Sequence, residues 1–248
     1  MKHEGFANRE GLEFRIFNYE DGSLALDIDY VNSSTLEFNS DHVAATAGVH
    51  GAEAVIFDEA LKGTFKFSTQ IIPIELIAVL SSPDAVTEGC TTSEKEEVTV
   101  ATGGTATLKM APVAGSVCAY SVDACKVGID TPIANVTVAD TTITIPEATE
   151  GAKYIVYYLA SQANATTVKF SDTLSPGYYS LYGKTNYKGT KNNKCSEYNH
   201  FYKLRPQKAL NLTYQGTGDP MSLEITFDVL SDDNGDFYDH GRIKPKKN

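Results

Sequence analysis

The sequence lacks tryptophan and is poor in cysteine, in long apolar runs and in basic residues. It has 248 residues, of which four are Cys and 42% are hydrophobic. The longest apolar run, Ile71–Leu80, is about half of the roughly 20 residues that span a bilayer, and Pro73 and Glu75 interrupt it. The first residues lack the apolar segment of a secretory signal. We therefore expect a soluble product that is made in the cytoplasm and makes no membrane contact.

The scarcity of cysteine excludes two further classes of protein. The four Cys residues form no CxxC pair and no spacing that suits zinc, and a disulfide-built secreted scaffold would be richer in cysteine. We expect reduced thiols, with a Cys118–Cys125 pairing across a hairpin as the alternative. The cysteines are Cys90, Cys118, Cys125 and Cys195.

No catalytic or cofactor-binding motif is present. The chain has no GxSxG, HExxH, P-loop or GxGxxG pattern, and its five histidines are scattered. The acidic run Asp232–Asp236 does not place the Gly and Glu residues that a calcium loop requires, so it is better explained as a solvated turn. We expect no catalytic residue, no metal and no cofactor, and therefore not an enzyme.

Charge is distributed unevenly along the chain, whose formal net charge is −11. Residues 1–90 hold 15 acids and 5 bases, residues 91–160 hold 8 and 4, and residues 161–248 hold 9 and 12. The successive net charges of −10, −4 and +3 exclude a protein that grips phosphates over its whole surface. An acidic beginning and a basic end favour contact between copies of one protein, with simple solvated surface as the alternative.

The clearest structural signal is alternation with a period of two. The segments Ser23–Val31 (SLALDIDYV) and Ser222–Val229 (SLEITFDV) each place apolar residues on one face and acids on the other. This pattern predicts long strands with one buried and one wet face. Only Pro73–Ser81 has a helical pattern, with an apolar face formed by Ile74, Ile77, Ala78 and Leu80.

Two changes in composition divide the chain. Residues 81–97 and 161–167 are polar, and the segment between them has the short strands and frequent turns of a small immunoglobulin-like sandwich. We predict a mainly β protein in which residues 1–90 and 164–248 form one β-sandwich with a short helix, and residues 91–163 form an inserted β-module. Such an insertion is tolerated because the cost of closing a loop grows slowly with its length.

Two stretches resemble the major tail tube proteins of tailed bacteriophages. They are Gly51–Ser82 (GAEAVIFDEALKGTFKFSTQIIPIELIAVLSS) and Phe201–Asp239, which contains KLRPQKALNLTYQGTGDPMSLEITFDVL. The inserted module resembles the immunoglobulin-like insertions that some of these proteins carry. The resemblance covers about two thirds of the chain, and its motifs are patterns of residue type.

This resemblance implies a structural role in the virion tail. Protomers would join through their sheets into hexameric rings around a continuous inner cylinder of strands, and the rings would stack head to tail into a hollow tube. The implied partners are further copies of the chain and other tail proteins, such as sheath, terminator, tape measure or baseplate. DNA would pass through the lumen during ejection without specific binding.

The alternating strands suggest which residues face the lumen and which make contacts. We expect the acids on the wet faces of the two clearest strands to face the lumen, with neighbouring protomers or solvent as the alternative: Asp27, Asp29, Glu224 and Asp228. We expect ring-to-ring or protomer contacts from a loop at 41–51 and a basic hairpin loop at 183–197, through Asp41, His50, Lys184, Lys188, Lys191 and Lys194.

The main alternative function is a surface binding module. Tyrosines cluster between residues 154 and 202, and interleaved lysines add to the suggestion of a surface that recognises glycan on a virion or a cell. Aromatic residues in strands more often serve sheet packing.

Overall fold

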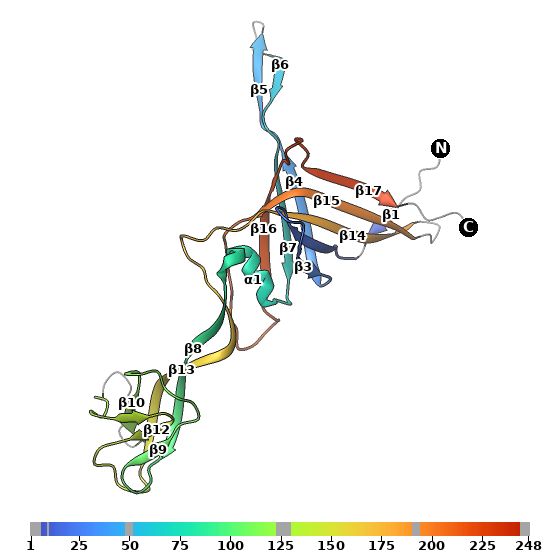
Figure 1. The fold of residues 1–248 in the computed structure, drawn as a ribbon. Coiled ribbons are helices and arrows are strands. Elements are labelled where there is room, and N and C mark those ends of the chain that lie inside the picture. Colours follow the sequence, from blue (N-terminus) through green and yellow to red (C-terminus); the bar gives the residue numbers. More distant parts are fainter. Residues whose placement is uncertain (1–5, 9, 48–51, 123–129, 190–193, 244–248) are drawn as a thin grey trace. The chain divides into compact units, whose positions relative to one another are not determined.

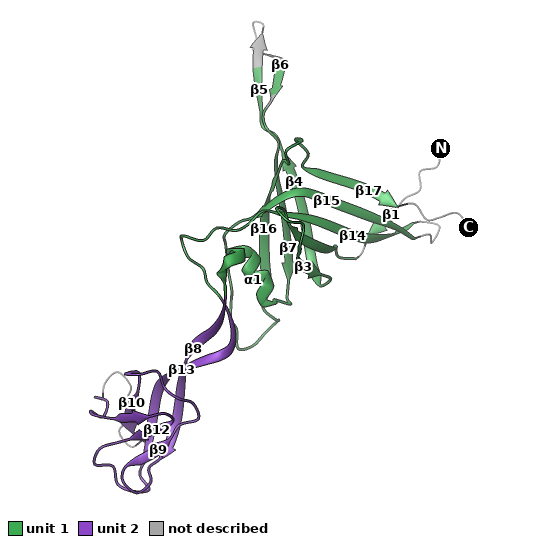
Figure 2. Cartoon of the chain, viewed as in Figure 1, with its two compact units in different colours: residues 1–86, 168–248 green, residues 87–167 purple. Residues whose placement is uncertain are grey.

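The chain folds into two compact units that are mainly antiparallel β-sheet, which confirms the predicted fold class. The computed structural model describes residues 6–8, 10–47, 52–122, 130–189 and 194–243. Residues 1–86 and 168–248 form unit 1, and residues 87–167 form unit 2 (Figure 2). Within the described residues there is one α-helix, α1 (Ile74–Ser81), followed by a short 3-10 helix at Pro83–Ala85.

Unit 1 contains one nine-stranded sheet and a separate hairpin (Figure 1). The order of the sheet is β3-β2-β14-β15-β16-β7-β4, with β1 paired to β14 and β17 paired to β15. Its strands are β1 (Phe6–Asn8), β2 (Glu13–Asn18), β3 (Leu24–Ile28), β4 (Val31–Asn39), β7 (Lys62–Thr69), β14 (Tyr179–Gly189), β15 (Lys194–Pro206), β16 (Leu223–Leu230) and β17 (Tyr238–Ile243).

The long strand β15 lets this sheet fold back on itself into two layers. Residues 196–201 of β15 pair with β17, whereas residues 203–206 pair with β16. We call β3-β2-β14-β15 with β1 and β17 layer A, and β16-β7-β4 layer B. Phe14 of layer A packs on Phe65 and Phe67 of layer B, with ring centroids 5.8 and 4.9 Å apart. The inward faces of the two layers therefore share one core.

The core of unit 1 follows from the alternation of the strands. On β16 the burial alternates strictly, so that Leu223, Ile225, Phe227 and Val229 point inward. Buried residues of β2, β3, β7, β14 and β15 join them in a single apolar cluster. Burial of these large aromatic and aliphatic side chains is the main stabilising contribution to the unit.

Helix α1 closes this core with a face that overlaps only in part with the predicted one, since Leu80 is buried as predicted and Ile77 and Ala78 are half-buried. The helix begins one residue later than predicted, because Pro73 precedes it in an extended conformation, and Leu76, Val79 and Leu80 are buried. The prediction that Ile74 points into the core is wrong, because its side chain is exposed. Nearly every position from Ile74 to Leu80 is apolar, so the periodicity of the sequence did not select one face.

A two-stranded hairpin of β5 (His42–Ala47) and β6 (Ala52–Asp58) continues from β4 and leads back into β7 (Figure 1). Among the described strands, β5 and β6 pair only with each other. The prediction of a loop at 41–51 is therefore wrong for residues 42–47. The small residues of this segment (HVAATA) gave no strand pattern, because the strand is defined by its pairing with β6, about ten residues later.

Unit 2 is a small double-layered β-structure with its own core. Its two three-stranded sheets have the orders β10-β13-β8 and β11-β12-β9. Val98, Ile143, Val156 and Tyr158 are buried between them. The strands are β8 (Val86–Thr99), β9 (Thr105–Thr107), β10 (Cys118–Ser121), β11 (Thr137–Ala139), β12 (Thr142–Thr144) and β13 (Lys153–Val168).

Several element boundaries that we predicted from polar composition are wrong. The polar stretches at 81–97 and 161–167 lie largely within β8 and β13, and the basic stretch at 183–197 is mostly strand, in β14 and β15. Residues 210–214 (LNLTY) alternate between apolar and polar side chains as a strand does, yet they form no strand. Exposed positions of long strands carry polar residues as readily as loops do, and composition alone does not separate the two.

Candidate functional site

The outward face of layer B is mostly polar. The outward positions of β16, β7 and β4 alternate with the core-facing positions, and half-exposed Leu230 at the end of β16 is the large apolar side chain among them. Three carboxylates and two ammonium groups give this face a net charge of −1. Its members are Ser33, Thr35, Glu37, Asn39, Lys62, Thr64, Lys66, Ser68, Glu224, Thr226 and Asp228.

The outward face of layer A is aromatic and basic. Tyr182 of β14 stacks on His200 of β15 with ring centroids 4.1 Å apart, and His200 lies 4.2 Å from Tyr202. Phe17 of β2 packs edge-on against Tyr182 at 5.7 Å. Burial lowers the pKa of His200, so that its neutral form is favoured within this stack. Half-exposed rings of this kind are typical of contact surfaces.

The four acids predicted to face one lumen lie on two different layers. Asp27 is on the outward face of β3 in layer A, with Asp29 just beyond the strand, and both are exposed. Glu224 and Asp228 are on the outward face of β16 in layer B. Since the two layers pack on the same core from opposite sides, these outward faces point away from each other. A single lumen can take at most one of the two pairs.

The environments of these acids also differ. Asp27 is 3.4 Å from Arg15 Nε in an exposed ion pair of little energetic value. Asp228 accepts a hydrogen bond of 2.8 Å from the Gln207 side chain, while Glu224 is exposed. These contacts do not bring the carboxylates together into a cluster. Dispersed carboxylates suit the wall of a lumen better than a ligand-binding site.

The predicted contact residues lie at the base of the β5–β6 hairpin and on the paired strands β14 and β15, which we call the β14–β15 arm. Asp41 is exposed and lies 3.4 Å from Lys62 Nζ at the base of the β5–β6 hairpin. Lys184 and Lys188 point outward on β14, and Lys188 lies opposite Lys194 of β15 in the pairing register. His50 and Lys191 lie outside the described residues, as does Cys125.

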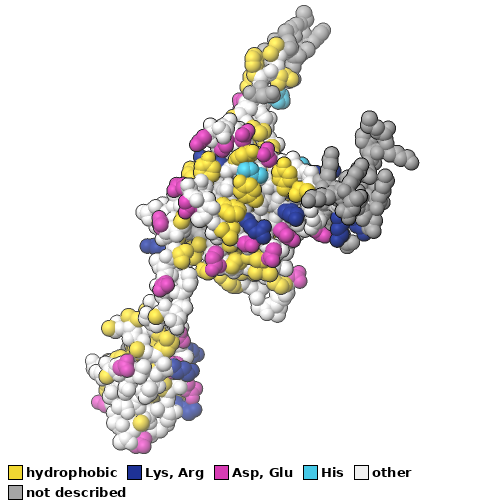
Figure 3. Space-filling view, turned by 45° about the vertical axis from the view of Figure 1, so that its right-hand side comes forward, with side chains coloured by type: hydrophobic (Ala, Val, Ile, Leu, Met, Phe, Trp, Pro, Cys, Tyr) yellow, Lys and Arg dark blue, Asp and Glu magenta, His cyan; other side chains and the backbone are white. Residues whose placement is uncertain are grey.

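The β5–β6 hairpin is the most apolar exposed element of unit 1. Val43, Val55, Ile56 and Phe57 are 50–61% exposed, and hydrophobic side chains cover much of the hairpin in the space-filling view (Figure 3). An isolated two-stranded hairpin is only marginally stable in water. Among the described residues no third strand pairs with the hairpin, and an exposed apolar surface of this kind is typical of interaction sites.

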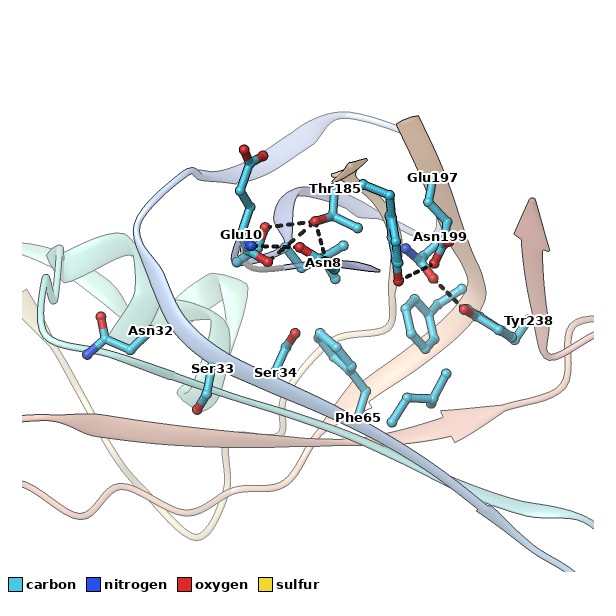
Figure 4. Close-up of a pocket in the computed structure, with 15 residues that line it drawn as sticks. Asn8, Glu10, Asn32, Ser33, Ser34, Phe65, Thr185, Glu197, Asn199 and Tyr238 are labelled. Atoms are coloured by element: carbon cyan, nitrogen blue, oxygen red, sulfur yellow. Dashed lines mark hydrogen bonds between the residues drawn. The ribbon is translucent and has the colours of Figure 1, made fainter. Parts of the chain in front are cut away.

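Sequence reasoning missed a polar pocket that lies between the layers. It has a volume of about 480 Å³ and opens between β4 on one side and the β14–β15 arm on the other (Figure 4). Asn8, Glu10 and Thr185 lie at one wall and Ser34 lies opposite them, with Phe65 beside it. The only trace in the sequence is the inward series Cys195, Glu197, Asn199 and Phe201, where polar residues interrupt an apolar face.

The tyrosines between residues 154 and 202 are divided between the two units. Tyr154, Tyr157 and Tyr158 belong to unit 2, whereas Tyr178–Tyr202 belong to unit 1. Tyr158 is buried and donates a hydrogen bond to Glu96, and burial raises its pKa to about 12. The proposed glycan surface is therefore divided between two units.

The described part of the chain offers neither a metal-binding cluster nor a helix that could span a membrane. Among those residues no group of three or more His, Cys, Asp or Glu side chains is arranged to hold a metal ion. No helix within the described ranges is long and apolar enough to cross a membrane.

Residues 9–239 match a family described as the YomU/Tube protein family, so the match extends through both units. A comparison with curated proteins returns no match. The family agrees with the resemblance noted in the sequence at the level of a tube-like structural protein of a bacteriophage particle. Because the match covers far more than half of its length, the chain belongs to the YomU/Tube protein family.

Proposed function

We propose that the protein assembles into stacked hexameric rings that form the tube of a phage tail, through which DNA leaves the particle. The observation that carries the proposal is the pair of unlike outward faces in unit 1, one mostly polar and the other aromatic and basic. Membership of a tube family and the uncovered β5–β6 hairpin support it. Ring number and stacking follow from the resemblance of the sequence to tail tube proteins.

Layer B suits the wall of the lumen better than layer A does. Its outward face carries Thr, Ser and Asn with a net charge of −1, and it offers no aromatic ring on which a base could stack. Glu224 and Asp228 are then the lumen-facing acids. Asp27 and Asp29 belong to layer A, whose rings and lysines suit contacts with protein.

A wall of this kind lets DNA pass without holding it. DNA carries one negative charge per about 1.7 Å of helix axis, so a basic channel would bind the phosphates and slow their passage. A weakly acidic, hydroxyl-rich wall gives no phosphate site and repels at close range, with screening beyond about 8 Å at physiological salt.

The hairpin and the basic arm are the proposed contacts between copies. The hairpin carries exposed apolar side chains, and the exposed carboxylates of Asp41 and Glu59 lie at its base. The β14–β15 arm brings Lys184, Lys188 and Lys194. Apolar burial would supply the affinity, and the opposite charges would guide the approach of one copy to another.

Electron microscopy of concentrated purified protein tests the assembly. Stacked rings or hollow tubes are the expected result. Persistent monomers over a wide range of concentration and salt would overturn the proposal. Binding of monomers to a glycan array would instead favour the alternative function.

Thiol labelling of assembled tubes tests the assignment of the lumen. Glu224→Cys should react with a small maleimide and be shielded from a long polyethylene-glycol maleimide, because a polymer enters a narrow tube poorly. Glu88→Cys, at an exposed position of unit 2, is the matched acid-to-thiol control and should show no such dependence on reagent size. Reaction of position 224 with both reagents at equal rates would place layer B outside the lumen.

A further inference from the structure

The interlayer pocket is a cavity within unit 1 that the proposed function leaves unused. On β4, Leu36 and Phe38 pack against the apolar core, whereas Ser34 on the same face is exposed. The Ser34 hydroxyl points from β4 into the pocket (Figure 4). On β15, the inward positions Glu197 and Asn199 likewise replace apolar residues. Such a departure from the apolar pattern, within a fold that otherwise obeys it, is typical of a functional surface.

The buried carboxylate of Glu197 holds one wall of the pocket in place. Its side chain is 5% exposed and accepts a hydrogen bond of 3.0 Å from the Tyr187 hydroxyl. His240 Nε2 and Arg242 Nη2 lie 3.2 and 3.4 Å from its oxygens. Because Arg242 pairs with this carboxylate, Glu197 positions the Tyr187 ring and does not offer an unpaired charge to a ligand.

Tyr238 is fixed by the same network. Its hydroxyl donates a hydrogen bond to Asn199 Oδ1 and lies 3.0 Å from His240 Nδ1. Burial raises the pKa of the Tyr187 hydroxyl and raises the pKa of Tyr238 to about 12, so both hydroxyls keep their protons at neutral pH. The two rings are therefore neutral and already ordered, and a ligand does not have to immobilise them when it binds.

Three side chains of the lining keep free capacity for hydrogen bonds. The Asn32 amide and the Ser34 hydroxyl bond to no other described residue, and Asn199 Nδ2 has no acceptor within the described ranges. Amides and hydroxyls offer both donors and acceptors. A ligand that left these groups unpaired would lose the hydrogen bonds that they make with water. The pocket therefore favours a ligand that both donates and accepts.

The charges of the lining disfavour ionic ligands. Of the described residues that line the pocket, Glu10 and Glu197 are the charged ones, and no Lys, Arg or His is among them. A phosphate or carboxylate ligand would find no cation there. A cationic ligand would find Glu197 already paired, while the Glu10 side chain points away from the opposite wall and accepts a hydrogen bond of 3.1 Å from Asn186 (Figure 4).

We propose that the interlayer pocket binds a neutral polyhydroxylated ligand, of the class of a mono- or disaccharide. Sugar hydroxyls donate and accept at once, which matches Asn32, Ser34 and Asn199. The half-buried rings of Tyr187 and Tyr238 offer apolar surface to the C–H groups of a sugar ring. A volume of about 480 Å³ lies within the range of about 300–1,000 Å³ that is typical of ligand pockets. The inference concerns a single protomer and does not rest on assembly into a tube.

Saturation-transfer NMR on the full chain tests the ligand class. The probes are glucose, galactose, N-acetylglucosamine and maltose, with glucuronate as the anionic comparison. We expect at least one neutral sugar to bind saturably with a millimolar or lower Kd, and glucuronate to bind more weakly than the corresponding neutral sugar. Absence of saturable binding by every neutral probe would overturn the proposal, as would equal binding of glucuronate.

Two small truncations on β4 test the location of the site. Asn32→Ala with Ser34→Ala removes two of the free groups, and we expect it to weaken sugar binding about tenfold or more. Thr35→Ala with Asn39→Ala, on the outward face of the same strand, is the matched control and should keep the wild-type affinity. Circular dichroism confirms that both variants are folded. Equal affinities of the two folded variants would overturn the assignment to the pocket.

Filling the pocket gives a second test of the same location. Ser34→Tyr places a ring in the cavity, and we expect the folded variant to lose saturable sugar binding. Wild-type affinity in the folded Ser34→Tyr variant would overturn the proposal.

The outcomes also separate the pocket from the tube. Tubes formed by a protein that binds none of the sugars would overturn the pocket and leave the proposed function standing. Sugar binding that depends on Asn32 and Ser34, in protomers that never form tubes, would support the pocket and count against the proposed function alone.

Discussion

Leu80 and Ile74 lie on the same helix, but we expect their replacement to have very different effects on the stability of unit 1. Leu80 is 0% exposed in the core of unit 1, whereas Ile74 is 36% exposed. We expect Leu80→Ala to lower the free energy of unfolding of unit 1 by about 2–5 kcal/mol, through lost burial and the remaining cavity. Ile74→Ala should change it by only about 0.5 kcal/mol. Denaturant unfolding measures both, and equal losses would contradict the observed helix face.

Tyrosines with a raised pKa make the folded protein sensitive to alkali. Burial raises the pKa of Tyr179 from 10.0 to about 12, and a hydrogen bond to Asp239 is the main cause that raises the pKa of Tyr202 to about 12. A raised pKa in the folded state means that these protons stabilise the fold below pH 10. This contribution is lost as the pH rises from about 10 to about 12.

The sensitivity to alkali is measurable by absorbance of tyrosinate together with circular dichroism. Tyr179→Phe removes one of the linked groups while keeping the buried ring. We therefore expect the stability of this variant to fall less steeply above pH 10 than that of the wild type. An identical alkaline profile would show that Tyr179 does not titrate with the fold.

The β5–β6 hairpin tests assembly at the scale of one element. Ile56 and Phe57 are 56% and 61% exposed in the protomer, so replacing them should change the stability of the protomer only slightly. We expect Ile56→Ser with Phe57→Ser to abolish tubes in electron micrographs while leaving the melting temperature of the protomer unchanged. Val138→Ser, at a 40% exposed position of unit 2, is the control and should assemble normally.

Strands whose two faces differ in polarity were predictable from the sequence, and those with uniform faces were not. The alternation in SLEITFDV predicted β16 almost to the residue. In SLALDIDYV it predicted too long a strand, since β3 covers only Leu24–Ile28 and Leu24 at its end is exposed. Strand β4 has mostly polar or small residues, so its pairing with β7 and not its own pattern defines it.

The interlayer pocket depends on contacts between residues far apart in the sequence. Arg242 and His240 reach Glu197 because β17 pairs with β15, more than forty positions earlier along the chain. Asn8 reaches Thr185 through the pairing of β1 with β14. Local periodicity carries no information about such pairings. For the same reason the sequence did not show that Asp27 and Glu224 belong to opposite layers.

At the scale of the whole molecule, the two units are built to fold separately. Each has its own cluster of buried apolar residues. The ends of unit 1 that flank the insert are already joined, because the Lys169 N–H donates a hydrogen bond of 3.0 Å to the Ala85 carbonyl. A short Gly-Ser turn can therefore replace residues 87–167 with a small cost in loop entropy.

We expect this deletion to leave unit 1 folded and able to form tubes, since the outward faces and the hairpin both lie in residues 1–86 and 168–248. Circular dichroism should show a cooperative β-sheet transition, and electron micrographs should show tubes that lack the mass of unit 2. A deleted protein that folds but no longer assembles would place unit 2 in the contacts between copies. The tube would then depend on surfaces from both units, and the assignment of assembly to unit 1 alone would be wrong.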